Sequence, residues 1–263
     1  MRVIKVGGRV QQEPALVHAL ARAWHAAPGA TCVVHGGGDA VSALQRAMGV
    51  EPRFVAGRRV TSERDLEIVR MAVSGAENKK LVSRLVSGGV SAIGISGEDG
   101  GLIGAHAIDA VRYGRVGAPA EVQDALLRHL LAGGFMPVIS PLARDMDRAD
   151  GEPLNVNADD AAAAVAVALD ATELLLVSDV DAVFVDGAAV RTLDAHGAAC
   201  AIARGSAHGG MTAKIEAALR ALDAGIGVVR IGGVGMLTGG APILSRSPRT
   251  RRARPASAPA RHR

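Results

Sequence analysis

The sequence predicts an α/β fold, a three-layer αβα sandwich around a mainly parallel sheet. Short runs rich in β-branched residues alternate with Ala- and Leu-rich segments of helical period along most of the 263 residues. Apolar residues make up 49% of the chain, but aromatic residues only 2%, so Ala, Val, Leu and Ile must build the core. Such a core suits parallel strands that are covered on both faces by helices.

Six short apolar runs are expected to be strands, at residues 2–6, 31–35, 92–96, 136–140, 173–178 and 227–231. Seven periodic segments are expected to be helices, at residues 13–26, 40–48, 62–73, 76–86, 122–132, 159–169 and 212–224. Two irregular pieces, residues 51–60 and 101–116, fit small hairpins better than helices. In a sheet of this type, ligands bind outside the carboxyl ends of the strands.

The positive charge of the chain is confined to its end. The formal net charge is +4, and residues 245–263 hold seven arginines and no acidic residue, so the remainder carries 4 − 7 = −3. Without large apolar residues this tail is expected to be disordered and solvated. A contact between the tail and RNA or another polyanion is the alternative, and no specific nucleic acid is expected.

Neither membrane insertion nor a disulfide framework is expected. The apolar stretches are too short and too Ala-rich to span a bilayer, and residues 1–30 lack the pattern of a signal peptide. We therefore expect a cytoplasmic protein without membrane contact. Cys32 and Cys200 lie far apart without the spacing of metal ligands, and both are expected to be buried thiols.

Two glycine-rich segments follow expected strands. Lys5 lies in the first strand, which runs into Gly7 and Gly8; a second strand ends at Gly36-Gly37-Gly38, directly before a helix. Glycines allow backbone N–H groups to approach an anion, and the start of a helix offers unpaired N–H groups. The second segment predicts an anion cradle, whereas the Lys5 segment taken alone favours a strand with a solvent-facing lysine before a tight turn. His35 is expected to be structural, because the sequence places no nucleophile or carboxylate beside it.

Two further segments carry polar residues at helix starts. Asn155-Val156-Asn157-Ala158-Asp159-Asp160 holds more polar groups than a helix cap requires, and Lys214 lies one turn inside the helix that follows Gly209-Gly210. A lysine there reaches toward a phosphate, although an exposed helical lysine is an equal alternative. The P-loop and Rossmann motifs are both absent from the sequence, which weakens those two readings.

Together these segments resemble the amino-acid kinase family, over roughly residues 1–243, and within it the branch that acts on N-acetyl-L-glutamate. The resemblance rests on Lys5-Val6-Gly7-Gly8, His35-Gly36-Gly37-Gly38, Phe54-Val55-Ala56-Gly57-Arg58-Arg59-Val60-Thr61, Asn78-Lys79, Gly97-Glu98-Asp99-Gly100, Asn155-Val156-Asn157-Ala158-Asp159, Ser178-Asp179-Val180 and Gly210-Met211-Thr212-Ala213-Lys214. It implies transfer of the γ-phosphoryl group of ATP to the side-chain carboxylate of that substrate, the second step of arginine biosynthesis.

The resemblance also assigns residues to roles. Lys5 and Lys214 are expected to neutralise the transferring group, with Asp159 orienting both lysines. The expected substrate-binding residues are Gly37, Gly38, Arg59 and Asn155. The expected nucleotide-binding residues are Gly7, Gly8, Asp179, Val180, Asp181, Phe184, Gly210 and Met211. ATP and Mg²⁺ are the implied cofactors, with Mg²⁺ bound through the ATP phosphates and not by protein ligands.

The expected organisation is a kinase domain over residues 1–244, followed by the basic tail. Residues 1–170 would form the substrate lobe and residues 171–244 the nucleotide lobe. We expect a homodimer, because the chain begins at its first strand without the N-terminal helix that the resemblance associates with hexamers. Ala182 departs from the family pattern Asp-Val-x-Gly, and Asp181 adds negative charge near the expected phosphates, so both weaken the prediction of a nucleotide site there.

Two other functions stay open from the sequence. One is a sister branch of the same family that phosphorylates aminoadipate or glutamate carried on a small acidic protein. The other, from a different class, is a catalytically silent regulatory or nucleic-acid-binding module, which Ala182 and the arginine-rich tail suggest.

Overall fold

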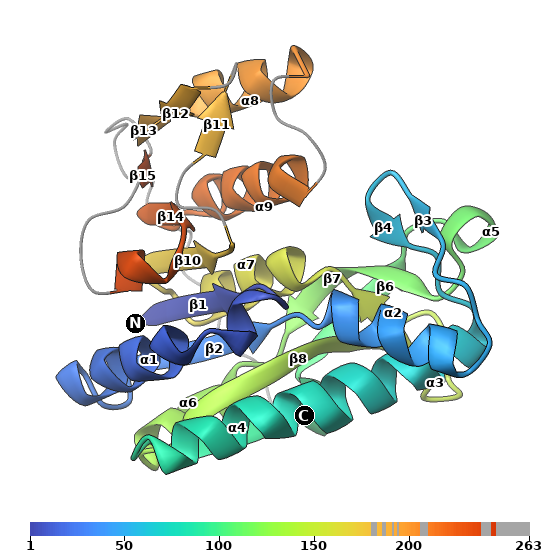
Figure 1. The fold of residues 1–263 in the computed structure, drawn as a ribbon, viewed down its shortest axis with the longest axis horizontal. Helices are drawn as coiled ribbons and strands as arrows, with labels where there is room; N and C mark the ends of the chain where they lie inside the picture. Colours follow the sequence, from blue (N-terminus) through green and yellow to red (C-terminus); the bar gives the residue numbers. More distant parts are fainter. Residues whose placement is uncertain are drawn as a thin grey trace, which may run out of the picture.

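Helices cover both faces of a central sheet. In the computed structural model, α7 (Ala158–Ala168) and α9 (Gly210–Asp223) lie on one face, and α1 (Pro14–Ala26) and α4 (Asn78–Ser87) on the other (Figure 1). This is the three-layer αβα sandwich that the sequence predicts. The structure describes residues 1–179, 183–185, 188–190, 192–193, 195–205, 210–237 and 243–245.

The sheet contains eleven strands among these residues. They are β1 (Arg2–Val6), β2 (Thr31–His35), β5 (Ala92–Gly97), β6 (Ile103–Ala107), β7 (Val116–Val122), β8 (Met136–Asp145), β9 (Pro153–Val156), β10 (Glu173–Val177), β13 (Thr192–Leu193), β14 (Val228–Gly232) and β15 (Ile243–Ser245). Their order is β13-β15-β14-β10-β1-β2-β8-β6-β7-β9, and β5 also pairs with β8.

The centre of the sheet is parallel, as expected. Strands β14, β10, β1, β2, β8 and β5 run in the same direction, whereas β6–β7, β8–β9 and β14–β15 are antiparallel. β1 and β2 are almost continuously apolar because both of their faces are covered. Lys5 is in register with Val34 and Leu176, so β1, β2 and β10 end side by side, where the glycine-rich segments begin.

One long helical run replaces the two helices expected at residues 62–73 and 76–86. α3 (Glu63–Val69) continues through a π-helix, η2 (Arg70–Glu77), directly into α4. The sequence suggested a break because Ser74 and Gly75 are poor helix formers. The wider π turn accommodates them, and the Ser74 hydroxyl lies 2.6 Å from the Ser140 hydroxyl on β8.

The expected hairpin within residues 101–116 is larger than predicted. β6 and β7 pair antiparallel around the short helix α5 (Ala110–Tyr113), and β7 extends to Val122. The helix expected from residue 122 therefore begins later, as α6 (Ala125–Ala132). β9 was not expected as a strand, and β8 runs five residues beyond the expected end because β9 and β6 pair with its second half.

Other elements complete the described chain. The hairpin expected at residues 51–60 is confirmed as β3 (Phe54–Val55) and β4 (Arg58–Arg59). The remaining helices are α2 (Gly38–Ala47), α8 (Ala195–Ala203), and the 3-10 turns η1 (Val10–Gln12), η3 (Asp99–Gly101) and η4 (Val234–Leu237); β11 (Val183–Val185) and β12 (Ala188–Val190) form a separate hairpin.

The two cysteines differ in burial. Cys32 is fully buried on β2, where burial raises the pKa of its thiol to about 12, whereas Cys200 on α8 is half-buried. None of the helices in the described ranges combines the length and apolar character that crossing a bilayer requires. The division into two lobes stays a prediction, and residues 246–263 of the tail lie outside the described residues.

Gly114 offers a test of the join between the β6–β7 hairpin and the segment before α3. It has φ +68°, and a Cβ atom there would lie 2.3 Å from the carbonyl oxygen of Thr61. We expect Gly114→Ala to lower the free energy of unfolding by about 3 kcal/mol, because backbone strain and overlap add. Urea unfolding measures this change.

Gly134→Ala is the matched control. Gly134 has a similar φ of +80°, but a Cβ atom there would meet nothing within 4 Å. It should therefore cost only the backbone strain, about 1 kcal/mol. Equal losses in the two variants would contradict the contact between Gly114 and Thr61.

Candidate active site

A buried carboxylate between two lysines forms the centre of the site. Lys5 of β1 places its Nζ 2.9 Å from Oδ1 of Asp159, and Nζ of Lys214 lies 3.6 Å from Oδ2 of the same carboxylate. Asp159 is 4% exposed and Lys5 5% exposed. The structure thus brings together the three residues predicted to be catalytic, from β1, α7 and α9.

The start of α7 fixes the Asp159 backbone. Asn157 precedes the helix, and its Oδ1 accepts a hydrogen bond of 2.8 Å from the backbone N–H of Asp159. This is the side-chain cap expected for part of the Asn-Val-Asn-Ala-Asp segment. A carboxylate in the first turn also faces the positive end of the helix dipole.

The ionisation of this cluster reflects burial and charge together. Burial acts to raise the pKa of Asp159, but the charges of Lys5 and Lys214 outweigh it and hold that pKa below its ordinary value. Burial and the charge of Lys5 lower the pKa of Lys214, and Asp159 opposes that shift. Two ammonium groups facing one carboxylate give the cluster a charge of +1 when all three are ionised, which suits an incoming anion.

The two glycine-rich segments face each other beside this cluster. A Cβ atom on Gly8 would lie 3.5 Å from the backbone nitrogen of Gly38. The N–H groups of Gly8, Gly37 and Gly38 donate no hydrogen bond to any residue that the structure describes. Gly37 and Gly38 stand at the start of α2, so the positions of these N–H groups are compatible with the anion cradle that the sequence predicts.

Gly7 differs from this expectation. Its N–H donates a hydrogen bond of 2.9 Å to the carbonyl oxygen of Val177 and so continues the pairing of β1 with β10. It is therefore not available to a phosphoryl oxygen in this conformation. A Cβ atom at Gly7 would also lie 3.3 Å from Val177 O, which is a tight contact that a small shift of the backbone would have to relieve.

A cavity of about 210 Å³ lies next to the cradle, between α2, the β3–β4 hairpin and β9. It is smaller than the roughly 300–1,000 Å³ of pockets for drug-sized ligands and suits a small metabolite. All four predicted substrate-binding residues line it: Gly37, Gly38, Arg59 and Asn155.

Arg59 enters this cavity as a buried and well-anchored guanidinium. Its Nη2 donates to the Gly38 carbonyl oxygen at 2.7 Å and to Ser42 Oγ at 2.8 Å, and its Nη1 donates to Gln45 Oε1. The guanidinium also lies 4.7 Å from the centre of the Phe54 ring, and burial lowers its pKa. A guanidinium that binds a carboxylate through two parallel hydrogen bonds uses an Nη2 hydrogen, so such a contact by Arg59 would require one of its two Nη2 bonds to be exchanged.

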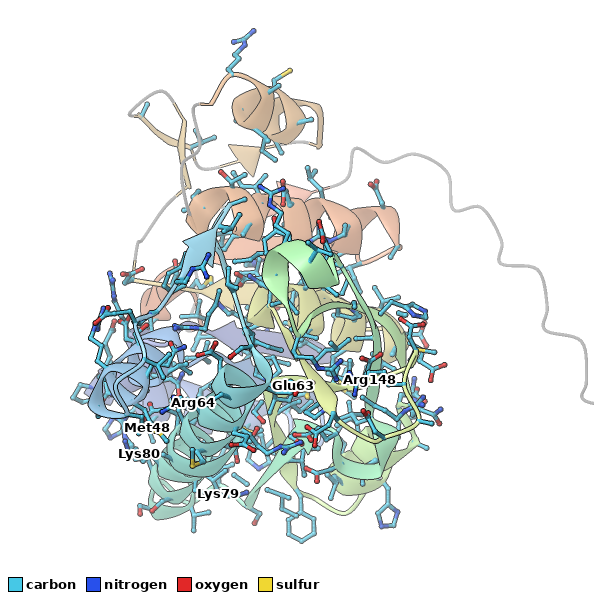
Figure 2. All side chains as sticks on the ribbon, turned by 90° about the vertical axis from the view of Figure 1, so that its right-hand side faces the viewer. Met48, Glu63, Arg64, Lys79, Lys80 and Arg148 are labelled. Atoms are coloured by element: carbon cyan, nitrogen blue, oxygen red, sulfur yellow. The ribbon has the colours of Figure 1, made fainter. Side chains whose placement is uncertain are left out.

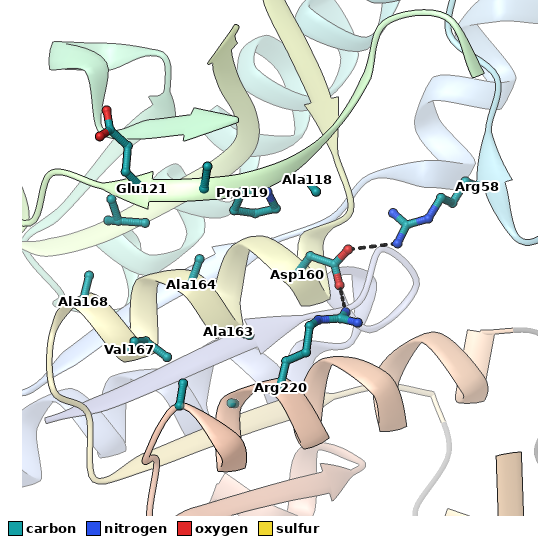
Figure 3. A pocket seen from close by; sticks show the side chains of 14 residues that line it. Arg58, Ala118, Pro119, Glu121, Asp160, Ala163, Ala164, Val167, Ala168 and Arg220 are labelled. Carbon is teal, nitrogen blue, oxygen red and sulfur yellow. Dashed lines mark hydrogen bonds and ion pairs between the residues drawn. The ribbon is translucent and has the colours of Figure 1, made fainter. Parts of the chain in front are cut away.

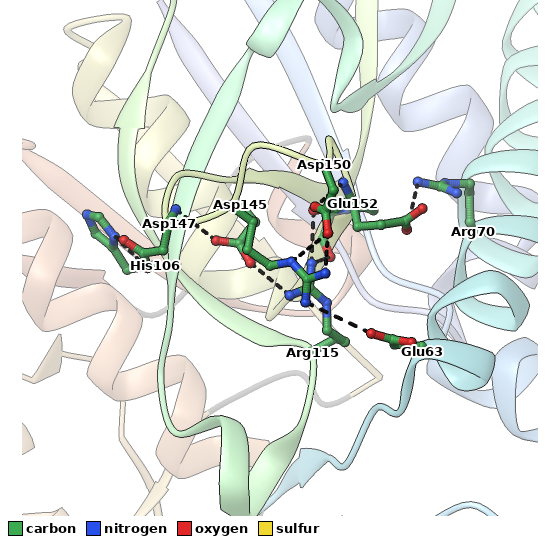
Figure 4. Close-up of polar contacts among 10 residues, drawn as sticks. Glu63, Arg70, His106, Arg115, Asp145, Asp147, Asp150 and Glu152 are labelled. Atoms are coloured by element: carbon green, nitrogen blue, oxygen red, sulfur yellow. Dashed lines mark hydrogen bonds and ion pairs between the residues drawn. The ribbon is translucent and has the colours of Figure 1, made fainter.

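Asn155 is held by contacts from both sides of β9. Its Nδ2 donates to Thr61 Oγ1 at 3.0 Å, which ties β9 to the segment after the hairpin. Arg115 positions the same strand: its Nη1 lies 2.8 Å from Asp145 Oδ2, and its Nη2 donates to the carbonyl oxygens of Glu152 and Pro153 (Figure 4). This polar network, which the sequence analysis did not identify, sets the entry of β9 into the site.

His35 and Asn78 support the cradle from below. Nδ1 of His35 lies 2.9 Å from the Gly36 carbonyl oxygen, and its Nε2 lies 3.0 Å from Asn78 Nδ2. Because a carbonyl only accepts and an amide nitrogen only donates, His35 is neutral with its proton on Nδ1. Burial lowers its pKa to about 4. His35 is thus structural, as expected, and its partner Asn78 was given no role from sequence although it is a buried amide within a helix.

The nucleotide side is described only in part. Asp179 is half-exposed and forms an ion pair with Arg9, 3.2 Å from Nη1, and Arg9 also contacts Asp39. Val180 and Asp181, together with Ala182, lie outside the described residues. Phe184 falls in β11, and Gly210 and Met211 begin α9, the helix that carries Lys214.

Comparisons with known proteins agree on one family. The amino acid kinase family model matches residues 1–232. Acetylglutamate kinase of Roseiflexus sp. (strain RS-1) is 42% identical over 246 residues, covering 92% of this chain and 93% of the relative. The enzyme of the same name from Geobacillus stearothermophilus is 42% identical over 223 residues, covering 84% and 85%.

Solved structures share the fold. The Streptococcus mutans UA159 protein smu.665 superposes with a TM-score of 0.81 at 31% identity, covering 88% of this chain and 94% of that protein. Carbamate kinase from Giardia lamblia bound to AMP-PNP superposes with a TM-score of 0.70, covering 94% and 98%; at 13% identity it shows the fold alone.

The neutral His35 predicts a pH-dependent stability. Its pKa is about 4 when folded and 6.5 in the ordinary case, so between these values the unfolded chain binds a proton that the folded chain excludes. Stability should therefore fall as pH decreases through this window, by about 3 kcal/mol from this residue. Urea unfolding at pH 4, 5, 6 and 7 measures the slope.

His35→Gln supplies the comparison, because glutamine does not titrate and keeps an oxygen that can accept from Asn78. The variant should lose less stability than the wild type between pH 6.5 and pH 4. Parallel slopes for the two proteins would show that His35 is not held neutral.

Proposed function

The chain belongs to the amino acid kinase family, and we propose that it transfers the γ-phosphoryl group of ATP to the side-chain carboxylate of N-acetyl-L-glutamate. The observation that carries this proposal is the Lys5–Asp159–Lys214 cluster beside the glycine cradle and the small cavity. Positive charge, free N–H donors and a metabolite-sized space meet at the carboxyl ends of β1 and β2.

The nucleophile in this reaction requires no general base. A carboxyl group with a pKa of about 4.3 is already ionised at neutral pH. A carboxylate oxygen forms the new bond to the γ-phosphorus, while the bond from that phosphorus to the β–γ bridging oxygen breaks and ADP leaves with the electron pair. This chemistry requires nothing of the nearby His35, whose Nδ1 proton and Nε2 lone pair are already used in hydrogen bonds to Gly36 and Asn78.

The barrier that remains is the approach of two anions. Lys5 and Lys214 would supply positive charge on two sides of the transferring group, with Asp159 holding both ammonium groups in place. The N–H groups of Gly8 and Gly37 would donate to phosphoryl oxygens. Fixed donors of this kind are effective because they need no reorganisation during the reaction.

The cavity would orient the substrate. Arg59 would bind the α-carboxylate after one of its Nη2 bonds to Gly38 or Ser42 is exchanged, and Asn155 would contact the acyl-amino group. The apolar wall of Val41, Val69, Val73 and Leu142 would pack against the carbon chain. These contacts would direct the side-chain carboxylate toward the lysine cluster.

Magnesium would enter with the nucleotide. Among the described residues, no group of three or more His, Cys, Asp or Glu side chains is arranged to hold a metal ion. Mg²⁺ would be carried mainly by the ATP phosphates and would supply further charge neutralisation there. Asp179 and Met211, both within the predicted nucleotide lobe, would line the nucleotide site, together with Phe184 and Gly210.

The alternatives from the sequence have less support. Relatives named acetylglutamate kinase match this chain at about 40% identity over most of their own lengths, which favours the free acyl amino acid over a carrier-linked substrate. The complete lysine–aspartate–lysine cluster argues against a catalytically silent module. The homodimer, the cytoplasmic location and the role of the tail stay predictions.

A coupled assay for ADP release tests the substrate. With ATP and Mg²⁺ present, we expect turnover with N-acetylglutamate, and at most weak turnover with glutamate, aspartate, carbamate or UMP. The apolar and N–H groups around the cavity select a small acylated acid. Preferred turnover of any other acceptor would contradict the assignment.

Lys214→Ala tests the charge cluster. Loss of one ammonium group should lower kcat by roughly a hundredfold or more, about 3 kcal/mol, because that charge acts mainly on the transition state. The fold should survive, because Asp159 keeps its ion pair with Lys5 at 2.9 Å when the longer contact with Lys214, at 3.6 Å, is lost. Steady-state kinetics and circular dichroism measure the two effects.

Lys80→Ala is the control for a lysine outside the site. Lys80 is 66% exposed on α4, on the outside of the molecule (Figure 2). The Lys80→Ala variant should keep kcat within twofold of the wild type. Near-normal turnover in Lys214→Ala would refute the role of Lys214.

A further inference from the structure

A second ion cluster surrounds Asp160, the residue after the catalytic aspartate. Arg58 Nη2 lies 3.1 Å from Asp160 Oδ2, and Arg220 Nη2 donates to Asp160 Oδ1. The two arginines reach the carboxylate from different elements, Arg58 from β4 and Arg220 from α9 (Figure 3). The cluster borders a cavity of about 410 Å³ between β7, α7 and α9.

Arg58 links this cluster to the substrate cavity. It precedes Arg59 on β4, and neighbouring side chains of a strand point to opposite sides. Arg59 is therefore tied to α2 through Gly38, Ser42 and Gln45, whereas Arg58 is tied to α7 through Asp160. Arg58 lines both cavities and so forms part of the wall between them.

Arg220 links the same carboxylate to the helix of Lys214. α9 is attached to α7 by two ion pairs, Lys214 with Asp159 and Arg220 with Asp160. Both carboxylates lie in the first turn of α7, so the position of this turn determines where α9 presents Lys214. Asp160 is buried, and each of its oxygens has an arginine partner.

We propose that Asp160 is a positioning residue that joins the substrate hairpin β3–β4 to the lysine-bearing helix α9 through its contacts with Arg58 and Arg220. This inference rests on the proposed function, since it assigns substrate positioning to the hairpin and charge neutralisation to Lys214. Asp160 acts through these two arginines and does not contact the reacting atoms.

The physical basis of the proposal is that each arginine loses its negatively charged partner when this carboxylate is removed. Asp160→Asn keeps the shape of the side chain but leaves two guanidinium groups facing an uncharged amide. A half-buried guanidinium without a counter-charge moves toward solvent, because leaving it in place costs its solvation. The hairpin and α9 would then lose their common attachment, and substrate binding and Lys214 placement would both loosen.

Kinetics of single variants separate the two arms of the cluster. Arg58→Met should raise KM for N-acetylglutamate about tenfold, since the hairpin is released. Arg220→Met should lower kcat by a similar factor with KM nearly unchanged, because α9 is affected and the hairpin is not. Asp160→Asn should do both, and Arg220→Lys, which keeps the charge, should recover most of kcat.

Double variants test whether Asp160 is the shared partner. In the Asp160→Asn background, Arg58→Met should add little to KM, and Arg220→Met should take little more from kcat. Effects that multiply would show that the arginines act independently of Asp160. A single Asp160→Asn variant with both kcat and KM within twofold of the wild type would also overturn the proposal.

Arg128→Met is the matched control. Arg128 lies on α6 and pairs with Asp124, which precedes that helix. Its side chain is 48% exposed, close to the 51% of Arg220. The control should leave both kinetic constants unchanged. Thermal melts of all variants identify a purely structural role, which would lower the melting temperature without the split between KM and kcat.

Hydrogen exchange provides a readout that needs no substrate. The Val60 N–H donates to the Arg53 carbonyl oxygen at 2.9 Å and closes the hairpin. Its exchange should be faster in Arg58→Met and Asp160→Asn, but not in Arg220→Met or Arg128→Met. If the wild type does not phosphorylate N-acetylglutamate, the proposed function fails while this exchange pattern still tests the link; unchanged exchange in an active enzyme overturns the link alone.

Discussion

A buried negative charge at Asp159 governs the arrangement of the elements around it. A carboxylate removed from water is costly unless it is paired, and its two partners come from opposite ends of the chain. Lys5 on β1 provides the shorter pairing with Asp159 at 2.9 Å, and Lys214 on α9 adds a second, longer contact at 3.6 Å. These two contacts fix the helix against the sheet and simultaneously produce a cluster with surplus positive charge, which is what phosphoryl transfer needs.

The glycine segments follow from the same geometry. β1 and β2 end side by side, so the two following loops lie close together, and a Cβ atom on Gly8 would contact the backbone nitrogen of Gly38 at 3.5 Å. The N–H groups that face the space between them are left without partners inside the described protein. His35 and Asn78 hold the second loop from beneath with uncharged hydrogen bonds, so the support adds no competing charge to the site.

The sequence predicted the central strands and pointed to Lys5, Asp159 and Lys214, which the structure brings together. It predicted less well the features that depend on pairing between distant segments. β1 and β2 can be recognised in the sequence because a strand buried on both faces is apolar almost throughout. β9 has only four residues and includes a proline, and it is a strand because β7 and β8 pair with it. Asp160 was given no role from the sequence, since nothing local shows that arginines about 60 and 100 residues away in sequence meet at its side chain.

Because of the π-helical run at residues 70–77, the geometry of the site depends on how many residues this segment contains. A π turn contains one residue more than an α turn, so every residue after the run is rotated about the helix axis relative to an unbroken α-helix. Asn78 is the first residue of α4 after this run, and its rotation brings the amide to His35. Length variation is tolerated in surface loops, but a deletion here would turn the amide away from the cradle without changing any residue that touches a ligand. The spacing between Ser62 and Asn78 is thus under the same constraint as the identity of the site residues.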